Sequence, residues 1–430
     1  MNITPTTGVT IRTVAERTGV SVHTLRAWER RYGVPKPNRL PSNRYRLYDE
    51  QDIADVLWLK QQVAVGVAPA QATRVLEQQR RARLVGVAVD ASLPSALQSA
   101  LETAFVQSDM DTARVILDRV FAELAPEQAL LQVIQPAVRE VGNRWMRNEM
   151  TVWQEHLASQ AVRQKLHVVL ESQPALPQTM PLLVAACAPG EEHELGLLMF
   201  ALLARQQGWR VTYLGRSTPL GDLSDLARAA KPNWLAVSLT TVSGLSGLIP
   251  WLSPAQRPNV PLLFGGRLPA LLPSLRAHLP GTCLGDDALA VVRGLVTCEP
   301  AKALWTPPKR VWQATHALRA QRFKIASEVV AQLLAGAPMS TRRGWQAADL
   351  NYATLYLLDA LSCALVFAVP ELMDVQKAWL EEAMLPRQVS PQLIRKHIEM
   401  VGRELQKNLT PEEGELAYPL LERLADYSFV

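Results

Sequence analysis

The sequence predicts a multidomain protein of the α and α/β classes, with a winged helix-turn-helix, a four-helix bundle, a doubly wound parallel sheet and a C-terminal all-α domain. Three observations predict this division. A pair of short amphipathic helices opens the chain, apolar runs of strand length alternate with helices in residues 179–300, and helical periodicity with few breakers fills residues 88–174 and 311–430. The helix-turn-helix is expected within residues 1–78.

The composition of the chain excludes several classes of protein. Nearly half of the 430 residues are hydrophobic, which is enough to bury several cores and excludes a disordered chain. No apolar run reaches the ~18 residues of a membrane span, and the N-terminus lacks a signal-peptide pattern. We therefore expect a cytoplasmic protein with no membrane partner. The four cysteines are far apart and show no metal-binding spacing.

The surplus positive charge of the chain is concentrated at its N-terminus. Residues 1–50 contain nine lysine and arginine side chains against four acidic side chains, whereas the rest of the chain contains 36 of each. A local basic surplus is the electrostatic pattern of a segment that binds nucleic acid. This pattern favours a nucleic-acid partner for the first domain.

The same N-terminal segment has the pattern of a helix-turn-helix. Ile11 and Val14 lie on one face of a short first helix, and a turn at Gly19 follows. Ser21 can cap a second helix, in which Leu25 would face inward. Such a second helix enters the major groove of double-stranded DNA. The side chains expected to contact bases or phosphates are Arg12, His23, Thr24, Arg26, Arg30, Arg31, Arg44 and Tyr45.

A β-wing is predicted over residues 39–48, where a turn separates basic and aromatic side chains. From residue 9 to about residue 77 the chain resembles the MerR family of regulators. The resemblance is carried by residues 10–15, 19–21, 24–30 and 44–48. MerR proteins typically continue into a long dimerisation coiled coil, but here the apolar pattern stops near Leu76 and residues 78–83 are polar and basic. We therefore expect later domains to assemble a homo-oligomer, a dimer or a tetramer, on a double-stranded DNA operator.

A histidine-containing loop is predicted at the carboxyl edge of the parallel sheet. The apolar run 182–187 has the pattern of a buried strand, and an apolar helix at 197–203 follows the loop. The spacing Glu191-x-His193-x-x-Gly196 resembles the Asp/Glu-x-His-x-x-Gly signature of cobalamin-binding domains. The resemblance implies that His193 is the lower axial ligand of cobalt, that Glu191 orients its ring, and that Gly196 admits the corrin edge.

Further strands are predicted at residues 211–215, 234–241 and 261–266, with a weak fifth strand at 282–285. Their alternation with helices is typical of a doubly wound sheet. The cobalamin resemblance implies that the ends of these strands line the cofactor and the slot for its nucleotide tail. The residues expected there are Leu214, Gly215, Ser238, Thr240, Gly265 and Gly266.

The predicted bundle contains Trp145, which is followed after nine residues by Glu155 and His156. This spacing, ahead of a cobalamin-type loop, resembles the light-responsive, adenosylcobalamin-dependent MerR repressors of the CarH/LitR group. The resemblance implies that Trp145 stacks against the adenosyl group while Glu155 and His156 hydrogen-bond its polar edges. The chain departs from the group at Met146, where many members have a histidine that binds cobalt after photolysis. A thioether is a poor ligand for oxidised cobalt, so the two-histidine photoproduct is not implied here.

Through residues 351–352 and 356–361, Trp379 and Arg387, the C-terminal segment 311–430 loosely resembles the globin-like, bilin-binding domain of photocobilins, which would add biliverdin as a second chromophore. The candidate bilin-lining residues are Trp345, Tyr352, Tyr356, Trp379 and His397. A helical oligomerisation domain without a cofactor is the alternative. Because every candidate cobalamin residue precedes residue 311, the segment is expected to be dispensable for cobalamin binding.

Together these features predict a light-responsive transcriptional regulator that uses adenosylcobalamin as its chromophore and is not an enzyme. Two other interpretations stay open. The protein could regulate transcription by sensing the supply of cobalamin without photochemistry, or it could be a corrinoid enzyme subunit. The enzyme interpretation leaves the basic helix-turn-helix unexplained and finds no substrate domain in the chain.

Overall fold

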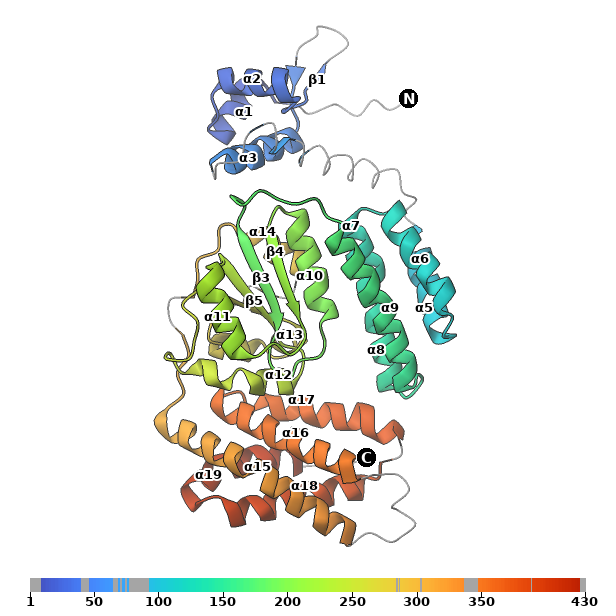
Figure 1. Ribbon diagram of the computed structural model, residues 1–430, viewed down its shortest axis with the longest axis vertical. Helices are drawn as coiled ribbons and strands as arrows, with labels where there is room; N and C mark the ends of the chain where they lie inside the picture. The colour runs from blue at the N-terminus through green and yellow to red at the C-terminus, as the bar shows by residue number, and fades with distance from the viewer. Residues whose placement is uncertain are drawn as a thin grey trace.

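The computed structural model describes residues 9–39, 46–64, 69, 72, 73, 76, 93–283, 285, 287–301, 304–335, 347–387 and 389–425. In these residues an N-terminal helical unit is followed by a helical bundle, a parallel sheet with flanking helices, and a C-terminal group of helices (Figure 1). No helix in the described ranges is long and apolar enough to cross a membrane.

The helices of the N-terminal unit are capped, and the turn at Gly19 and the cap at Ser21 are those that the sequence predicts. The Thr10 side chain accepts a hydrogen bond from the Thr13 amide, Gly19 adopts a φ of +64° that ends the first helix, and Ser21 caps the second helix at Thr24. Leu25 lies in the core of this unit. The elements are α1 (Ile11–Thr18), α2 (Val22–Tyr32), β1 (Asn38–Arg39), β2 (Arg46–Leu47) and α3 (Glu50–Ala64).

The two short strands pair antiparallel, with Asn38 opposite Leu47, as expected for the base of a wing. The predicted turn of the wing, with Arg44 and Tyr45, lies outside the described residues, as does the predicted polar hinge 78–83. The Tyr48 hydroxyl donates to Glu29 of α2 at 3.1 Å. This bond ties the wing to the second helix of the helix-turn-helix.

The bundle consists of helices that pack around a separate core. Helix α5 contacts α6 and α8, and α9 also contacts α6 and α8. Phe105, Leu130 and Leu166 are fully buried between them. The elements are α5 (Leu93–Val106), α6 (Met110–Glu123), a third helix built from α7 (Pro126–Gln128), η1 (Ala129–Ile134) and α8 (Gln135–Met146), and α9 (Val152–Glu171).

The described part of the sheet has four parallel strands in the order β4-β3-β5-β6. The strands are β3 (Leu182–Cys187), β4 (Arg210–Gly215), β5 (Trp234–Ser238) and β6 (Leu262–Gly265). The predicted fifth strand at 282–285 is wrong for the residues described there, of which only Thr282 pairs, in a bridge with Leu263. Gly285, with a φ of +125°, departs from extended geometry.

The alternation of side chains along each strand divides the sheet between two cores. Leu183 belongs to the core that the sheet shares with the bundle, α10 (Leu195–Gln206) and α14 (Ala288–Gly294), whereas its neighbour Val184 belongs to the core on the opposite face. That opposite face is covered by α11 (Leu220–Ala230), α12 (Val242–Gly247), η2 (Ile249–Leu252), α13 (Arg267–Leu271) and η3 (Pro273–His278).

The C-terminal helices are not separate from the sheet. Their buried residues, such as Leu358 and Leu361 of α16, belong to the same continuous core as Val237 and α12, and the helices lie below the carboxyl ends of the strands (Figure 1). This shared core argues against a dispensable segment. The elements are α15 (Lys309–Ala335), α16 (Ala347–Val366), α17 (Glu371–Trp379), η5 (Leu380–Met384), η6 (Leu385–Arg387), α18 (Pro391–Asn408) and α19 (Pro411–Ala425).

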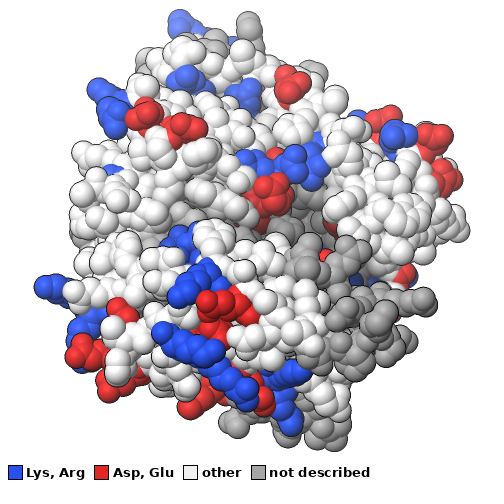
Figure 2. Space-filling view, turned by 60° about the horizontal axis from the view of Figure 1, so that its bottom comes forward, with Lys and Arg blue, Asp and Glu red and all other residues white. Residues whose placement is uncertain are grey.

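The surface charge agrees with the balance calculated beyond residue 50. On the face seen in Figure 2, basic and acidic side chains lie close to one another, so that no large area carries a single sign. A mixed surface of this kind gives no electrostatic footprint for nucleic acid. The basic surplus of residues 1–50 still makes the N-terminal unit the candidate for that contact.

Candidate functional site

His193 lies on the loop between β3 and α10, at the carboxyl edge of the sheet. Its Nδ1 is 2.7 Å from Glu191 Oε1, and its backbone N–H donates to the same oxygen at 3.0 Å. The His193 side chain is 63% exposed, whereas that of Glu191 is completely buried. Because Nδ1 is engaged by the carboxylate, Nε2 is the nitrogen available to a metal.

Glu191 is held from the other side by the end of β5. Its Oε2 accepts hydrogen bonds from the backbone amides of Thr240 and Thr241, both at 2.7 Å. Burial alone would raise the pKa of this carboxyl, but the hydrogen bonds from His193 and Thr240 outweigh it and lower the pKa. Glu191 is therefore an ionised carboxylate with hydrogen bonds to both oxygens, and it fixes the orientation of the imidazole.

The pKa of His193 is raised, mainly by its hydrogen bond to Glu191. The carboxylate of Glu155, on the bundle helix α9, adds to this shift. The structure thus brings a group predicted for the upper face of the cofactor into electrostatic range of the group predicted for the lower face.

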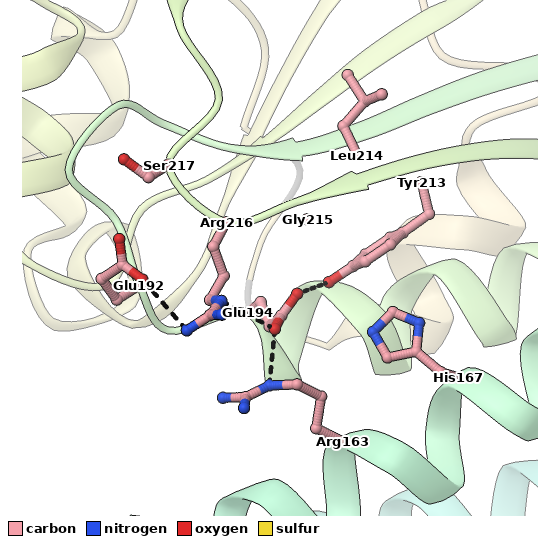
Figure 3. A pocket seen from close by; sticks show the side chains of 9 residues that line it. All are labelled: Arg163, His167, Glu192, Glu194, Tyr213, Leu214, Gly215, Arg216 and Ser217. Atoms are coloured by element: carbon pink, nitrogen blue, oxygen red, sulfur yellow. Dashed lines mark hydrogen bonds and ion pairs between the residues drawn. The ribbon is translucent and has the colours of Figure 1, made fainter.

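A second buried carboxylate joins the bundle to the sheet. Glu194 lies 2.7 Å from Arg163 Nε of α9 and 3.3 Å from Arg216 Nε, and it accepts a hydrogen bond from the Tyr213 hydroxyl at 2.8 Å (Figure 3). Burial and the Glu194 charge raise the pKa of Tyr213, so that its hydroxyl keeps its proton. Helix α9 is therefore attached to the same loop that carries His193.

These side chains border an open cavity of about 600 Å³ between α9 and the end of β4 (Figure 3). The lining residues are Arg163, His167, Glu192, Glu194, Tyr213, Leu214, Gly215, Arg216 and Ser217. Leu214 and Gly215 were expected at the cofactor, whereas the charged lining residues were not predicted from the sequence. These are Arg163, Glu192, Glu194 and Arg216. Arg163 follows Glu155 by eight residues, so helical periodicity could have placed both side chains on one face.

The glycines of the site leave room for a ligand. A Cβ added at Gly196 or Gly265 would meet no atom within 4 Å, so both positions are open. Gly266 has a φ of +109°, and a Cβ there would lie 2.4 Å from the Leu239 carbonyl oxygen. Only glycine fits this turn beside the buried end of β5, where Ser238 lies.

The predicted upper-face residues lie where α8 ends and α9 begins, at the end of the bundle that faces the C-terminal helices (Figure 1). Trp145 is half-buried near the end of α8, and Glu155 accepts a hydrogen bond from Ser159 at 2.5 Å. His156 is exposed and lies 3.6 Å from Glu155. An orientable imidazole, a buried carboxylate, open glycines and a half-buried indole form a set of groups that fits a corrinoid.

Three of the candidate bilin-lining residues form a row on the C-terminal helices. The Tyr352 and Tyr356 ring centroids lie 6.1 Å apart, and those of Tyr356 and Trp379 lie 6.2 Å apart. His397 is buried, whereas Tyr352 is exposed. The His397 side chain is 7% exposed, and its Nε2 lies 2.8 Å from Thr354 Oγ1. Burial lowers the pKa of His397 to about 4. Trp345 lies outside the described residues.

On the N-terminal unit, most predicted DNA contacts are free to reach a partner. The exposed side chains are Arg12, His23, Arg26, Arg30 and Arg31. The Thr24 hydroxyl lies 2.8 Å from that of Ser21, so it takes part in capping α2. Thr24 therefore has a structural task beside its predicted contact with DNA.

Comparison with known proteins finds similarity over three stretches. Residues 9–79 match the MerR HTH family regulatory proteins, and residues 97–170 and 181–293 each match a B12 binding domain. The HTH-type transcriptional repressor CarH of Myxococcus xanthus is 39% identical over 246 residues, which cover 55% of this chain and 79% of the relative. CarA of the same organism is 35% identical over 234 residues, which cover 53% of this chain and 75% of that relative.

Among solved structures, the monomethylamine corrinoid protein of Methanosarcina barkeri resembles the chain with a TM-score of 0.40 and 16% sequence identity. The similarity covers 47% of this chain and 99% of that protein. The three matched family stretches end at residue 293, before the C-terminal helices begin.

Proposed function

This chain belongs to the family of the HTH-type transcriptional repressors CarH and CarA, and from that membership we propose that it is a regulator that responds to light through adenosylcobalamin. It is a DNA-binding, cobalamin-binding protein and not a corrinoid enzyme, since its relatives are repressors with a MerR helix-turn-helix. The observation that carries the proposal is the pair formed by Glu191 and the exposed ring of His193.

In this proposal the residues at the edge of the sheet and those of the bundle have different roles. His193 would ligate the cobalt, with its ring fixed by Glu191, and Ser238 and the Gly265-Gly266 turn would contact the nucleotide part of the cofactor. Trp145 would stack against the adenosyl group, and Glu155 and His156 would hydrogen-bond its polar edges. When bound, adenosylcobalamin supplies a cobalt–carbon bond that light can break.

The signal would travel through the attachment of the bundle to the sheet. Arg163 and Glu194 hold α9 against the His193 loop, so a shift of the bundle strains or breaks this buried ion pair. We propose that the shift changes a homo-oligomer, a dimer or a tetramer. Fewer linked DNA-binding units would then hold the operator less tightly.

The experiment that tests the proposal compares absorption spectra and DNA affinity with adenosylcobalamin, in the dark and after green light. We expect a histidine-ligated spectrum that changes on illumination, together with a change in DNA affinity. A DNA affinity that depends on cobalamin concentration and not on light would instead identify a sensor of cobalamin supply. A protein that binds no adenosylcobalamin would contradict the proposal altogether.

Trp145→Ala should reduce the preference for adenosylcobalamin over hydroxocobalamin by about ten-fold, because stacking of a base on an aromatic ring is worth about 1–3 kcal/mol. Binding through His193 should persist. Calorimetry with both cobalamins measures the two affinities. Trp153→Ala is the matched control, since Trp153 is an exposed tryptophan near the start of α9. Equal preference in the Trp145 variant and the wild type would assign Trp145 to the bundle core alone.

Arg26→Ala and Arg31→Ala should weaken DNA binding in different ways. Arg26 lies in the middle of α2, where a contact to a guanine is worth roughly 1–3 kcal/mol, so its loss should lower specific more than non-specific affinity. Arg31, in the last turn, should contact phosphate, and its loss should reduce the salt slope by about one for every sequence. Salt titrations with operator and unrelated DNA separate the two. Identical behaviour would contradict the proposed orientation of α2.

A second chromophore is a further candidate function, favoured by the row of Tyr352, Tyr356 and Trp379. We propose that this row takes up biliverdin, because a flat conjugated ligand can stack on aligned rings. Biliverdin added to the full-length protein should give a protein-bound, red-shifted absorption band, and Tyr352→Ala should weaken it. Phe323→Ala removes another exposed aromatic ring of the same segment and is the control. The absence of such a band in the wild type would favour the oligomerisation domain.

A further inference from the structure

Arg387 connects the C-terminal helices to the end of the bundle. Its guanidinium donates to the Trp145 carbonyl oxygen at 2.6 Å and to the Met146 carbonyl oxygen at 3.2 Å. The same group lies over the Trp145 indole, with Cζ 4.6 Å from the ring centroid. Nearby, the Asn148 amide donates to the Pro386 carbonyl oxygen at 3.4 Å. The contacts thus join residues that are far apart in the chain.

Arg387 binds the end of α8 through hydrogen bonds to its backbone and a cation–π contact with its tryptophan. Helix α8 ends at Met146, and the last carbonyl oxygens of a helix have no partners within it and carry partial negative charge. A guanidinium offers a planar fork of N–H donors, so it can bind two such oxygens while its face stacks on an aromatic ring. Arg387 therefore holds both the backbone and the ring of Trp145.

Arg387 is itself held within the C-terminal segment, and this segment is attached to α12. Arg387 also donates to the Ala383 carbonyl oxygen in its own segment. The C-terminal helices are attached to α12, where Ser246 donates to Asp359 at 3.1 Å and accepts from Arg319 at 2.5 Å. The amide of Thr241, immediately before α12, binds Glu191. The C-terminal segment thus touches both the end of α8, which carries Trp145, and helix α12, whose preceding residue Thr241 binds Glu191.

We propose that Arg387 is a positioning residue for Trp145, through which the C-terminal domain sets the preference of the site for adenosylcobalamin. The inference rests on the proposed function of Trp145. With one face of the indole against the guanidinium, the ring is held in one orientation before an adenine stacks on it, and less rotamer freedom is lost on binding. Without Arg387 the ring regains this freedom and the end of α8 loses a cap.

The test uses the full-length protein and the variants Arg387→Gln, Arg387→Lys and Arg423→Gln. Arg423 pairs with Asp374 on the surface of the same segment and is the control. We expect Arg387→Gln to lower the preference for adenosylcobalamin over hydroxocobalamin by about five-fold, the scale of a partly desolvated cation–π contact. Arg387→Lys should restore part of the preference, because it keeps the cation without the fork. In a Trp145→Ala background, Arg387→Gln should have no further effect.

A second measurement needs no cofactor. In fluorotryptophan-labelled protein, the fluorine resonance absent from Trp145→Phe belongs to Trp145. That resonance should shift in Arg387→Gln and stay in place in Arg423→Gln. An unmoved resonance, or an unchanged or increased adenosyl preference, would overturn the inference. If the wild type binds no cobalamin through His193, the proposed function fails, while the resonance still decides whether Arg387 positions Trp145.

Discussion

His193→Ala is expected to abolish histidine-ligated cobalamin binding and to raise the Kd more than about 100-fold. Loss of a partner that merely orients a metal-binding histidine already costs about 10- to 100-fold in affinity. The fold should be unaffected, because the side chain is 63% exposed and fills no core space. The absorption spectrum of bound hydroxocobalamin and the thermal unfolding midpoint check both expectations.

Two companion variants sharpen this result. Glu191→Gln should keep cobalamin bound but weaken it about 10- to 100-fold, because the neutral amide orients the imidazole less well than the buried carboxylate does. His316→Ala removes an exposed histidine of α15 and should bind like the wild type. A histidine-type spectrum that survives in His193→Ala would show that another residue ligates the cobalt.

Deletion of residues 311–430 is expected to unfold or aggregate the sheet that carries the cofactor site. The C-terminal helices and one face of the sheet share a single core, in which Leu245 of α12 and Leu361 of α16 are both buried. Each large apolar side chain that such a deletion exposes costs about 1.5–3 kcal/mol, and a domain has only about 5–15 kcal/mol to lose. Cobalamin uptake should disappear with the fold.

Size-exclusion chromatography, circular dichroism and cobalamin titration measure this outcome. Deletion of residues 1–78 is the control, since the N-terminal unit has its own core. From the rest of the chain, Met180 and Leu176 pack against this core. That shorter protein should still bind cobalamin. A soluble protein that ends at residue 310 and binds cobalamin like the wild type would support the separable segment that the sequence predicts.

Local signals account for the features that could be predicted from the sequence. The turn at Gly19 and the cap at Ser21, together with apolar positions at helical spacing, identified the helix-turn-helix, because a cap acts over three residues of the chain. The strand at 182–187 was identified by its apolar run, because a strand that is buried on both faces of a sheet needs apolar residues throughout.

The sequence by itself thus determined the order of helices and strands, and it paired Glu191 with His193 because a separation of two residues on one loop permits a hydrogen bond. Tertiary structure alone decided that Glu194 receives Arg163 from the bundle and that Arg387 covers Trp145, 242 residues away. It also decided that the C-terminal helices complete the core of the sheet. Such contacts depend on which faces pack together, and periodicity along one element shows that a face is buried without identifying its partner.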